Sequence, residues 1–84
     1  MKLEDTHCYD NRYGVFDDVE DAKVECRRNS SCKAVYDNYC DNSEQDVYLC
    51  PVGYDYETSN RGSCVYEKLG LLYEIYRYLL QDYK

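Results

Sequence analysis

Apolar residues recur with a helical period near residue 20, and this pattern predicts one helix at about residues 18–29. Asp17 or Asp18 is a suitable N-cap, and acidic residues follow in the first turn, where they complement the helix dipole. Three apolar residues define the inward face of this helix: Val19, Ala22 and Cys26. Asn29-Ser-Ser at the helix end is a candidate N-glycosylation sequon, which would place Asn29 at the surface.

Three later segments have the β-branched and aromatic composition of short strands. They cover residues 32–37, 47–50 and 63–67, and the polar segments 41–46 and 58–62 are predicted loops. No connection between these strands has room for the crossover that a parallel pair needs, so we expect an antiparallel sheet. The expected fold class is α+β, with one helix packed on that sheet.

The C-terminal segment has a different pattern, which predicts an amphipathic helix at about residues 69–83. Five residues form its apolar stripe: Leu69, Leu72, Tyr76, Leu79 and Tyr83. Further apolar residues widen this stripe to more than half of the circumference, which is more than one docking surface covers. We therefore expect a homodimer through this helix, the alternative being a helix that packs on its own domain. The expected organisation is a disulfide domain at 1–68 and a helical extension at 69–84.

The chain has six cysteines in 84 residues, and none of them is in the Cys-x-x-Cys spacing of a zinc ribbon or a redox pair. A disulfide framework is the expected use, because a domain of this size has a modest core and gains stability from crosslinks. Disulfides persist in oxidising compartments, so we expect a secreted, extracellular protein. No signal peptide is present, and Met1 is expected to replace a removed leader.

The formal net charge is −7, from 17 acidic and 10 basic side chains, and the basic residues are scattered along the sequence. Nucleic acid and anionic membranes bind clustered Lys and Arg, so neither is an expected partner. Cationic partners and neutral glycans remain open. No apolar run approaches the roughly 20 residues of a membrane span.

No residue pattern predicts catalysis, a metal site or a cofactor. The single histidine, His7, adjoins Cys8 and has no converging partners for a triad or a zinc site, so a structural or solvent-exposed role is expected. Two acidic clusters lack the spacing of a calcium loop and are interpreted as helix capping and as a solvated loop. The clusters are Asp17, Asp18, Glu20 and Asp21, and Asp37, Asp41, Glu44 and Asp46.

Tyrosine dominates the aromatic residues, with 12 Tyr, one Phe and no Trp. Its ring packs in cores and interfaces, while its hydroxyl needs a polar partner. Core packing is the expected role of Tyr36, Tyr48 and Tyr66. Tyr54 and Tyr56 lie in a segment rich in turn residues and are the expected pair for ligand contact.

Five motifs occur in order between Cys8 and Lys68 with compatible gaps. They are a first Cys, Phe-Asp-Asp-Val-Glu-Asp-Ala-Lys-Val-Glu-Cys, Asn-x-x-Cys-x-Ala-Val-Tyr-Asp, Tyr-Leu-Cys, and Gly-Ser-Cys-Val-Tyr-Glu-Lys. Together they resemble the PAN/apple superfamily, especially its small secreted invertebrate members. The resemblance covers about residues 8–68 and leaves the C-terminal segment outside.

The resemblance implies a helix held by a curved antiparallel sheet with nested disulfides, which pair Cys8 with Cys64, Cys26 with Cys50, and Cys32 with Cys40. The cysteine positions alone do not select one connectivity. They do favour the middle pair, because Cys26 lies on the inward helix face and Cys50 lies in an apolar strand.

Members of this superfamily bind proteins or carbohydrates and are not enzymes. The expected function is therefore that of a secreted, non-enzymatic recognition module, which binds an extracellular protein or glycan and self-associates through its C-terminal helix. Two alternatives remain open. One is a structural or adhesive tyrosine-rich secreted protein, and the other is a venom or salivary effector that blocks a host receptor.

Overall fold

The computed structural model describes residues 1–41 and 46–68 of the chain. In these ranges it has one α-helix, α1 (Val19–Arg28), and a short 3-10 helix, η1 (Tyr9–Asn11). The strands are β1 (Lys2–Glu4), β2 (Thr6–His7), β3 (Tyr13–Phe16), β4 (Cys32–Asp37), β5 (Val47–Pro51), β6 (Glu57–Thr58) and β7 (Cys64–Glu67). The small disulfide-rich α+β fold is confirmed. The predicted C-terminal helix, with its five stripe residues, lies outside the described residues.

The helix α1 forms where its capping and periodicity predict. Asp18 is the N-cap, and its side chain accepts a hydrogen bond from the backbone N–H of Glu20 at 2.7 Å. Arg27 and Arg28 occupy the last turn, where positive charge complements the helix dipole. The three residues of the predicted inward face are all buried: Val19, Ala22 and Cys26.

The main sheet has five strands in the order β1-β7-β4-β5-β3, and every pair in it is antiparallel. A separate two-stranded ribbon joins β2 to β6. The predicted strands correspond to β4, β5 and β7. Four further strands were not predicted and have two to four residues each: β1, β2, β3 and β6. Gly14 interrupts the pattern of β3, with a positive φ of 71°.

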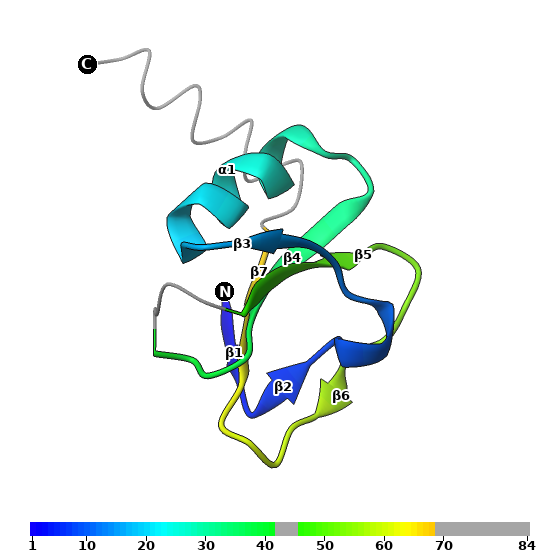
Figure 1. The fold of residues 1–84 in the computed structure, drawn as a ribbon. Coiled ribbons are helices and arrows are strands. Elements are labelled where there is room, and N and C mark those ends of the chain that lie inside the picture. The colour runs from blue at the N-terminus through cyan, green and yellow to red at the C-terminus, as the bar shows by residue number, and fades with distance from the viewer. Residues whose placement is uncertain (42–45, 69–84) are drawn as a thin grey trace, which may run out of the picture.

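The five-stranded sheet has two differently covered faces. The helix face packs against α1 through a buried cluster: Val19, Ala22, Cys26, Cys32, Val35, Val47 and Leu49. The far face carries a second buried cluster: Cys8, Ala34, Tyr36, Cys50 and Val65. Figure 1 shows α1 along one side of the sheet and the β2–β6 ribbon at the opposite end of the molecule. Both faces of the central strand β4 are therefore buried.

The disulfide pairing that the resemblance implied is wrong. All six cysteines are paired, but the bonds join Cys8 to Cys50, Cys26 to Cys32, and Cys40 to Cys64. The alternation of β5 explains why Cys26 does not reach Cys50. Val47 and Leu49 point to the helix face, so Cys50 points to the far face, away from α1.

The other two corrections follow from strand register. A bulge between Cys32 and Ala34 places Cys32 on the helix face, where it meets Cys26. Cys64 is paired in the sheet with Glu4 and with Asp37, so it lies near the end of β4 and bonds Cys40. The chain turns at Asp5, which has a positive φ of 50°, before it reaches Cys8.

Candidate ligand-binding pocket

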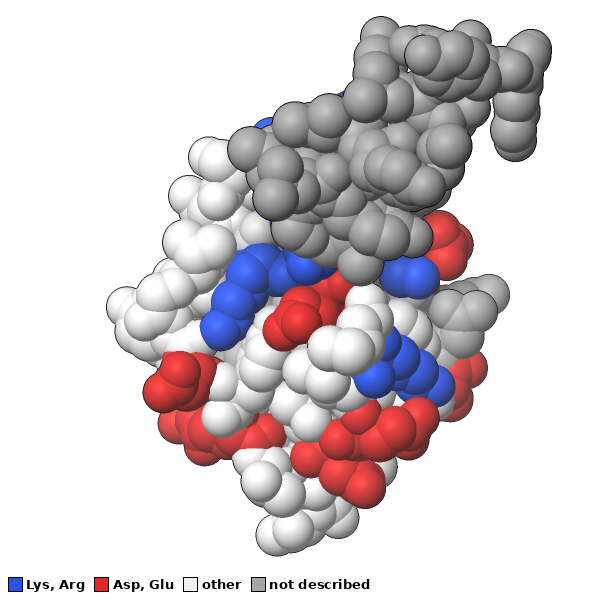
Figure 2. All heavy atoms as spheres, turned by 180° about the vertical axis from the view of Figure 1, so that it is seen from behind, with Lys and Arg blue, Asp and Glu red and all other residues white. Residues whose placement is uncertain are grey.

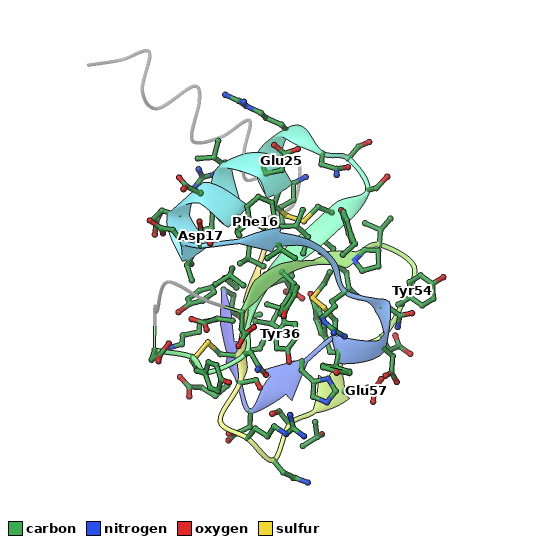
Figure 3. All side chains as sticks on the ribbon, in the orientation of Figure 1. Phe16, Asp17, Glu25, Tyr36, Tyr54 and Glu57 are labelled. Atoms are coloured by element: carbon green, nitrogen blue, oxygen red, sulfur yellow. A yellow bond between two sulfur atoms is a disulfide. The ribbon has the colours of Figure 1, made fainter. Side chains whose placement is uncertain are left out.

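A pocket of about 300 Å³ opens on the far face, between the η1 region and the β6–β7 loop. Residues from three separate parts of the chain line it: His7, Tyr9, Tyr36, Thr58, Ser59, Asn60, Arg61 and Ser63. Figure 3 shows Tyr36 inside this part of the molecule, between the sheet and β2. Volumes of about 300–1,000 Å³ are usual for small-ligand sites. The pocket is therefore the candidate binding site of the described residues.

His7 and Tyr9 form the first wall of the pocket. The His7 Nδ1 atom accepts a hydrogen bond from the Tyr9 backbone N–H at 3.0 Å, and the two rings meet edge to face with centroids 6.5 Å apart. The His7 ring also lies 6.1 Å from the Tyr36 ring. Since Nδ1 accepts this bond, the neutral imidazole carries its proton on Nε2, which remains a donor.

Arg12 supports the Tyr9 side of this wall from the end of η1. Its guanidinium carbon lies 3.7 Å from the centroid of the Tyr9 ring and 5.0 Å from that of Tyr48. Its Nη1 also donates to the Tyr9 carbonyl oxygen at 2.6 Å. These contacts combine a cation–π interaction with a charge-assisted hydrogen bond. They fix the position of a ring that is 46 % exposed.

Tyr36 forms the floor of the pocket and is 2 % exposed. Its hydroxyl donates to Asn38 Oδ1 at 2.8 Å, so the buried oxygen has a polar partner. Burial raises the pKa of the Tyr36 hydroxyl, while the positive charges of Arg12 and Arg61 act in the opposite direction. Both arginines therefore affect the electrostatic potential at the pocket floor.

Two buried serines hold the loop that forms the second wall. Ser59 Oγ donates to Ser63 Oγ at 2.9 Å, and Ser63 Oγ donates to the Asn38 carbonyl oxygen at 2.9 Å. Ser59 Oγ also accepts the backbone N–H of Arg61 at 3.1 Å. Gly62 has a φ of 77°, a conformation that glycine adopts without steric cost. The loop is thus held by hydrogen bonds within itself and to Asn38 and Asp5.

Two disulfides lie directly beside the pocket walls. Cys8 stands between His7 and Tyr9, and its bond to Cys50 fixes the first wall to strand β5. Cys64 follows Ser63, and its bond to Cys40 fixes the end of the second wall. These bonds close segments of 42 and 24 residues in sequence separation, so they restrict the walls relative to the sheet.

The structure places the predicted contact pair, Tyr54 and Tyr56, outside this pocket. Tyr54 is 53 % exposed and projects from the outer edge of the molecule (Figure 3). Tyr56 is half-buried against the far-face cluster, and its hydroxyl donates to Glu67 Oε2 at 3.0 Å. Burial raises the pKa of Tyr56, and the hydrogen bond to Glu67 adds to this effect. Lys33 lies over the Tyr56 ring and donates to the Tyr54 carbonyl oxygen.

Tyr56 instead lines a second hollow, of about 390 Å³, on the other side of the β2–β6 ribbon. Its remaining lining residues are Lys2, Leu3, Glu4, Thr6, Glu57 and Thr58. The two predicted contact tyrosines are therefore not a joint surface. One of them is exposed, and the other forms the wall of a different depression.

The sequon residue Asn29 caps the C-terminus of α1 and is half-buried. Its side chain donates to the Tyr13 hydroxyl at 3.2 Å and accepts the Ser31 backbone N–H at 2.9 Å. A glycan on this nitrogen would lie next to the Tyr13 hydroxyl and leave one amide hydrogen as a donor. Glycosylation at Asn29 stays a prediction.

The first acidic cluster includes the N-cap of α1, as the capping interpretation predicts. In the second cluster, Asp37 is buried and accepts hydrogen bonds from the backbone N–H groups of Tyr39 and Cys40. Across residues 1–41 and 46–68, no three His, Cys, Asp or Glu side chains converge as a metal site would require. The same ranges contain no helix long and apolar enough to cross a membrane.

Charge is distributed in small groups over the surface. Figure 2 shows Lys and Arg side chains as separate patches on the rear face, with acidic side chains between and below them. The scattered basic residues of the sequence therefore do not assemble into a continuous stripe on this face.

No family model matches the chain, and no curated protein or solved structure matches it. The PAN/apple resemblance accordingly stays a prediction based on the five motifs.

The pocket has no signature in the sequence, because its walls come from three segments without a shared motif. His7 appeared as a lone histidine, and residues 58–62 appeared as an ordinary loop. One local signal was available: His7 and Tyr9 flank Cys8, so any disulfide at Cys8 had to anchor both of them to the domain.

Proposed function

We propose that this chain is a secreted, non-enzymatic recognition module that binds an extracellular protein or glycan through the pocket on its far face. The observation that supports this function best is the ordered pocket itself. Aromatic rings form its floor and one wall, exposed polar side chains form its rim, and two disulfides anchor its walls. A rigid site of this kind loses little conformational entropy when it binds, which favours recognition.

The disulfide framework supports an extracellular location. All six cysteines are crosslinked, and at least five of their side chains are buried. Such bonds form and persist in oxidising compartments and are rare in the cytosol. The PAN/apple resemblance carries the same expectation of a secreted binding module.

The binding role can be tested with two exposed tyrosines. Tyr9 is 46 % exposed and lines the pocket, whereas Tyr54 is 53 % exposed and lies away from it. The labelled wild-type protein, Tyr9→Ala and Tyr54→Ala would be applied to arrays of glycans and of peptides. We expect Tyr9→Ala to lose at least about tenfold in affinity for the bound array component, and Tyr54→Ala to retain wild-type affinity.

The opposite result would assign recognition to the Tyr54 segment and contradict the pocket. Circular dichroism and thermal unfolding of both variants provide the control for folding. Equal binding by all three proteins would also contradict the proposal, because an exposed pocket ring would then contribute nothing to recognition.

The proposal includes a homodimer, which rests on the residue pattern of the segment 69–84 alone. Light scattering of the wild type beside Leu72→Asp with Leu79→Asp tests it. We expect the wild type to have a dimeric mass and the double variant a monomeric mass, because charges would replace the apolar stripe. Arg77→Gln, in the predicted polar sector, is the matched control. A monomeric wild type would contradict the dimer and leave the pocket proposal unaffected.

A further inference from the structure

The pocket lining contains no acidic side chain, although the chain has 17 of them. Arg61 and His7 are its only side chains of basic type, and the other lining residues are neutral. The second hollow is lined by Glu4, Glu57 and Lys2. Lys2 forms an ion pair with Glu4 at 3.3 Å, so Glu57 gives this lining a net negative charge. The two depressions therefore differ in the sign of the charge that they offer to a ligand.

The positive charge around the pocket has no ion-pair partner among the residues that the structure describes. Neither Arg12 nor Arg61 forms an ion pair in the part of the chain that the structure describes. Arg12 is occupied by the Tyr9 ring and carbonyl, which leaves its charge uncompensated. The side chain of Arg61 has no hydrogen-bond partner among the described residues, and only its backbone N–H is bonded. An anion that enters the pocket would be attracted by the positive charges of both Arg12 and Arg61.

The rim of the pocket offers neutral hydrogen-bonding groups beside this charge. Thr58 and Asn60 are exposed on the second wall, and His7 retains Nε2–H as a donor on the first. The hydroxyl protons of Ser59 and Ser63 are already donated, to Ser63 Oγ and to the Asn38 carbonyl oxygen respectively. The free polar groups are thus at the rim, while the arginine charges act on the floor.

We infer that the pocket binds a sugar acid, with the carboxylate held by Arg61 near the Tyr36 floor and the sugar hydroxyls bonded at the rim. This inference rests on the proposed function and specifies its ligand class. A guanidinium and a carboxylate form strong charge-assisted hydrogen bonds, and the Tyr9 ring provides an apolar surface for a sugar face.

The size and charge of the protein favour a single carboxylate over a polyanion. A volume of about 300 Å³ suits one sugar residue. The net charge of −7 repels an extended chain of sulfates or phosphates, whereas a single charge inside the pocket lies next to arginine. An acidic amino-acid side chain would also supply the carboxylate, but its apolar stem offers the polar rim fewer hydrogen-bonding groups than the hydroxyls of a sugar ring do.

The test compares two probes that differ only at one carbon: methyl β-glucuronide, which has a carboxylate, and methyl β-glucoside, which has a hydroxymethyl group. Both would be titrated into the full chain and followed by amide chemical shifts. We expect the glucuronide to shift the resonances of residues 7–9 and 58–63 and to bind at least about tenfold more tightly than the glucoside. We expect Arg61→Gln to reduce that difference to about twofold or less.

Arg27→Gln is the matched control, because Arg27 is an exposed arginine in the last turn of α1 and lies outside the pocket. It should bind the glucuronide like the wild type. Equal binding of the two sugars would overturn the charge inference while the recognition module stands. If an N-acetyl-glutamate amide shifts the same resonances and binds more tightly than the glucuronide, the inferred sugar ligand is wrong, and the ligand is a carboxylate of a protein. If neither sugar binds but array binding still depends on Tyr9, the sugar-acid ligand is wrong and the proposed recognition function stands.

Discussion

The helix face and the far face of the central sheet are closed in different ways. The helix face is closed by aliphatic side chains of α1, β4 and β5, with a disulfide between Cys26 and Cys32 that spans six positions. The far face is closed by loops and tyrosines, with a disulfide between Cys8 and Cys50 that spans 42 positions. The helix α1 covers one face, whereas loops and short strands cover the other and leave a pocket of about 300 Å³. The far face is therefore the side on which the candidate pocket lies.

The largest expected difference between the faces comes from removing their disulfides. Cys8→Ala with Cys50→Ala should lower the free energy of unfolding by about 4 kcal/mol, since the closed loop is long. Cys26→Ala with Cys32→Ala should cost about 2 kcal/mol, because the loop is short. Urea unfolding of the two double variants measures both values. A larger loss for the Cys26 and Cys32 pair would show that the helix face depends more on its crosslink.

A cavity on the helix face should cost nearly as much as the long disulfide. Leu49→Ala removes a side chain that is 1 % exposed and packs between β5 and α1, so we expect a loss of about 3 kcal/mol. The pocket residues are on the other face, and ligand binding by the folded fraction should be unchanged. Urea unfolding and the array assay would be run in parallel. A stable Leu49→Ala protein without binding would show that the two faces are coupled.

One local change on each face should lower the free energy of unfolding by about 1 kcal/mol. Asp18→Ala removes the N-cap bond of α1 and should destabilise the protein by about 1 kcal/mol without affecting the pocket. Gly62→Ala strains the second wall, because an L-residue at a φ of 77° costs about 1 kcal/mol. Thermal unfolding gives the stability of both. Only Gly62→Ala should also change the pocket resonances, and equal spectra would contradict the anchoring of this loop.

The smallest effect is expected at alkaline pH. The folded-state pKa values of Tyr36 and Tyr56, on the far face, are raised by burial above the ordinary value of about 10. Their protonated forms stabilise the fold below that pH, and this stability is lost as the pH rises through the raised folded-state values. Unfolding free energies measured from pH 8 upwards should therefore decline.

Tyr56→Phe should make that decline less steep, by up to about one proton of linkage. Tyr54→Phe is the control, because Tyr54 is exposed and the structure gives its hydroxyl no buried partner in the described region. Equal slopes for Tyr56→Phe and the wild type would show that Tyr56 ionises alike in the folded and unfolded chain.

Much of the fold was predictable from local patterns. The capping and spacing of residues 18–29 predicted α1 within one residue at each end, because helix signals are local in sequence. The strands β4, β5 and β7 were predicted from β-branched and aromatic runs. Strands as short as β2 and β6 lacked such a run. They are fixed by pairing with each other, as in Thr6 with Thr58, which no single segment reveals.

The candidate site was less predictable than the fold. Tyr54 and Tyr56 share a segment rich in turn residues, yet Tyr56 packs inward and bonds Glu67, eleven positions away. His7 had no neighbouring motif, yet the chain brings it beside Tyr36 and Arg61. These positions depend on where the chain returns after Cys8 and after β6, and hence on contacts between distant segments.

The sequence by itself determined that this protein is a small crosslinked α+β domain, because periodicity, capping and cysteine number are properties of short segments and of composition. The tertiary structure alone decided which cysteines meet. A bulge turns Cys32 towards α1, and the alternation of β5 turns Cys50 away from it. A shift of one residue in either strand would move the cysteine to the opposite face of the sheet. Because Cys50 points to the far face, its bond to Cys8 also holds His7 and Tyr9 on that face, beside Tyr36.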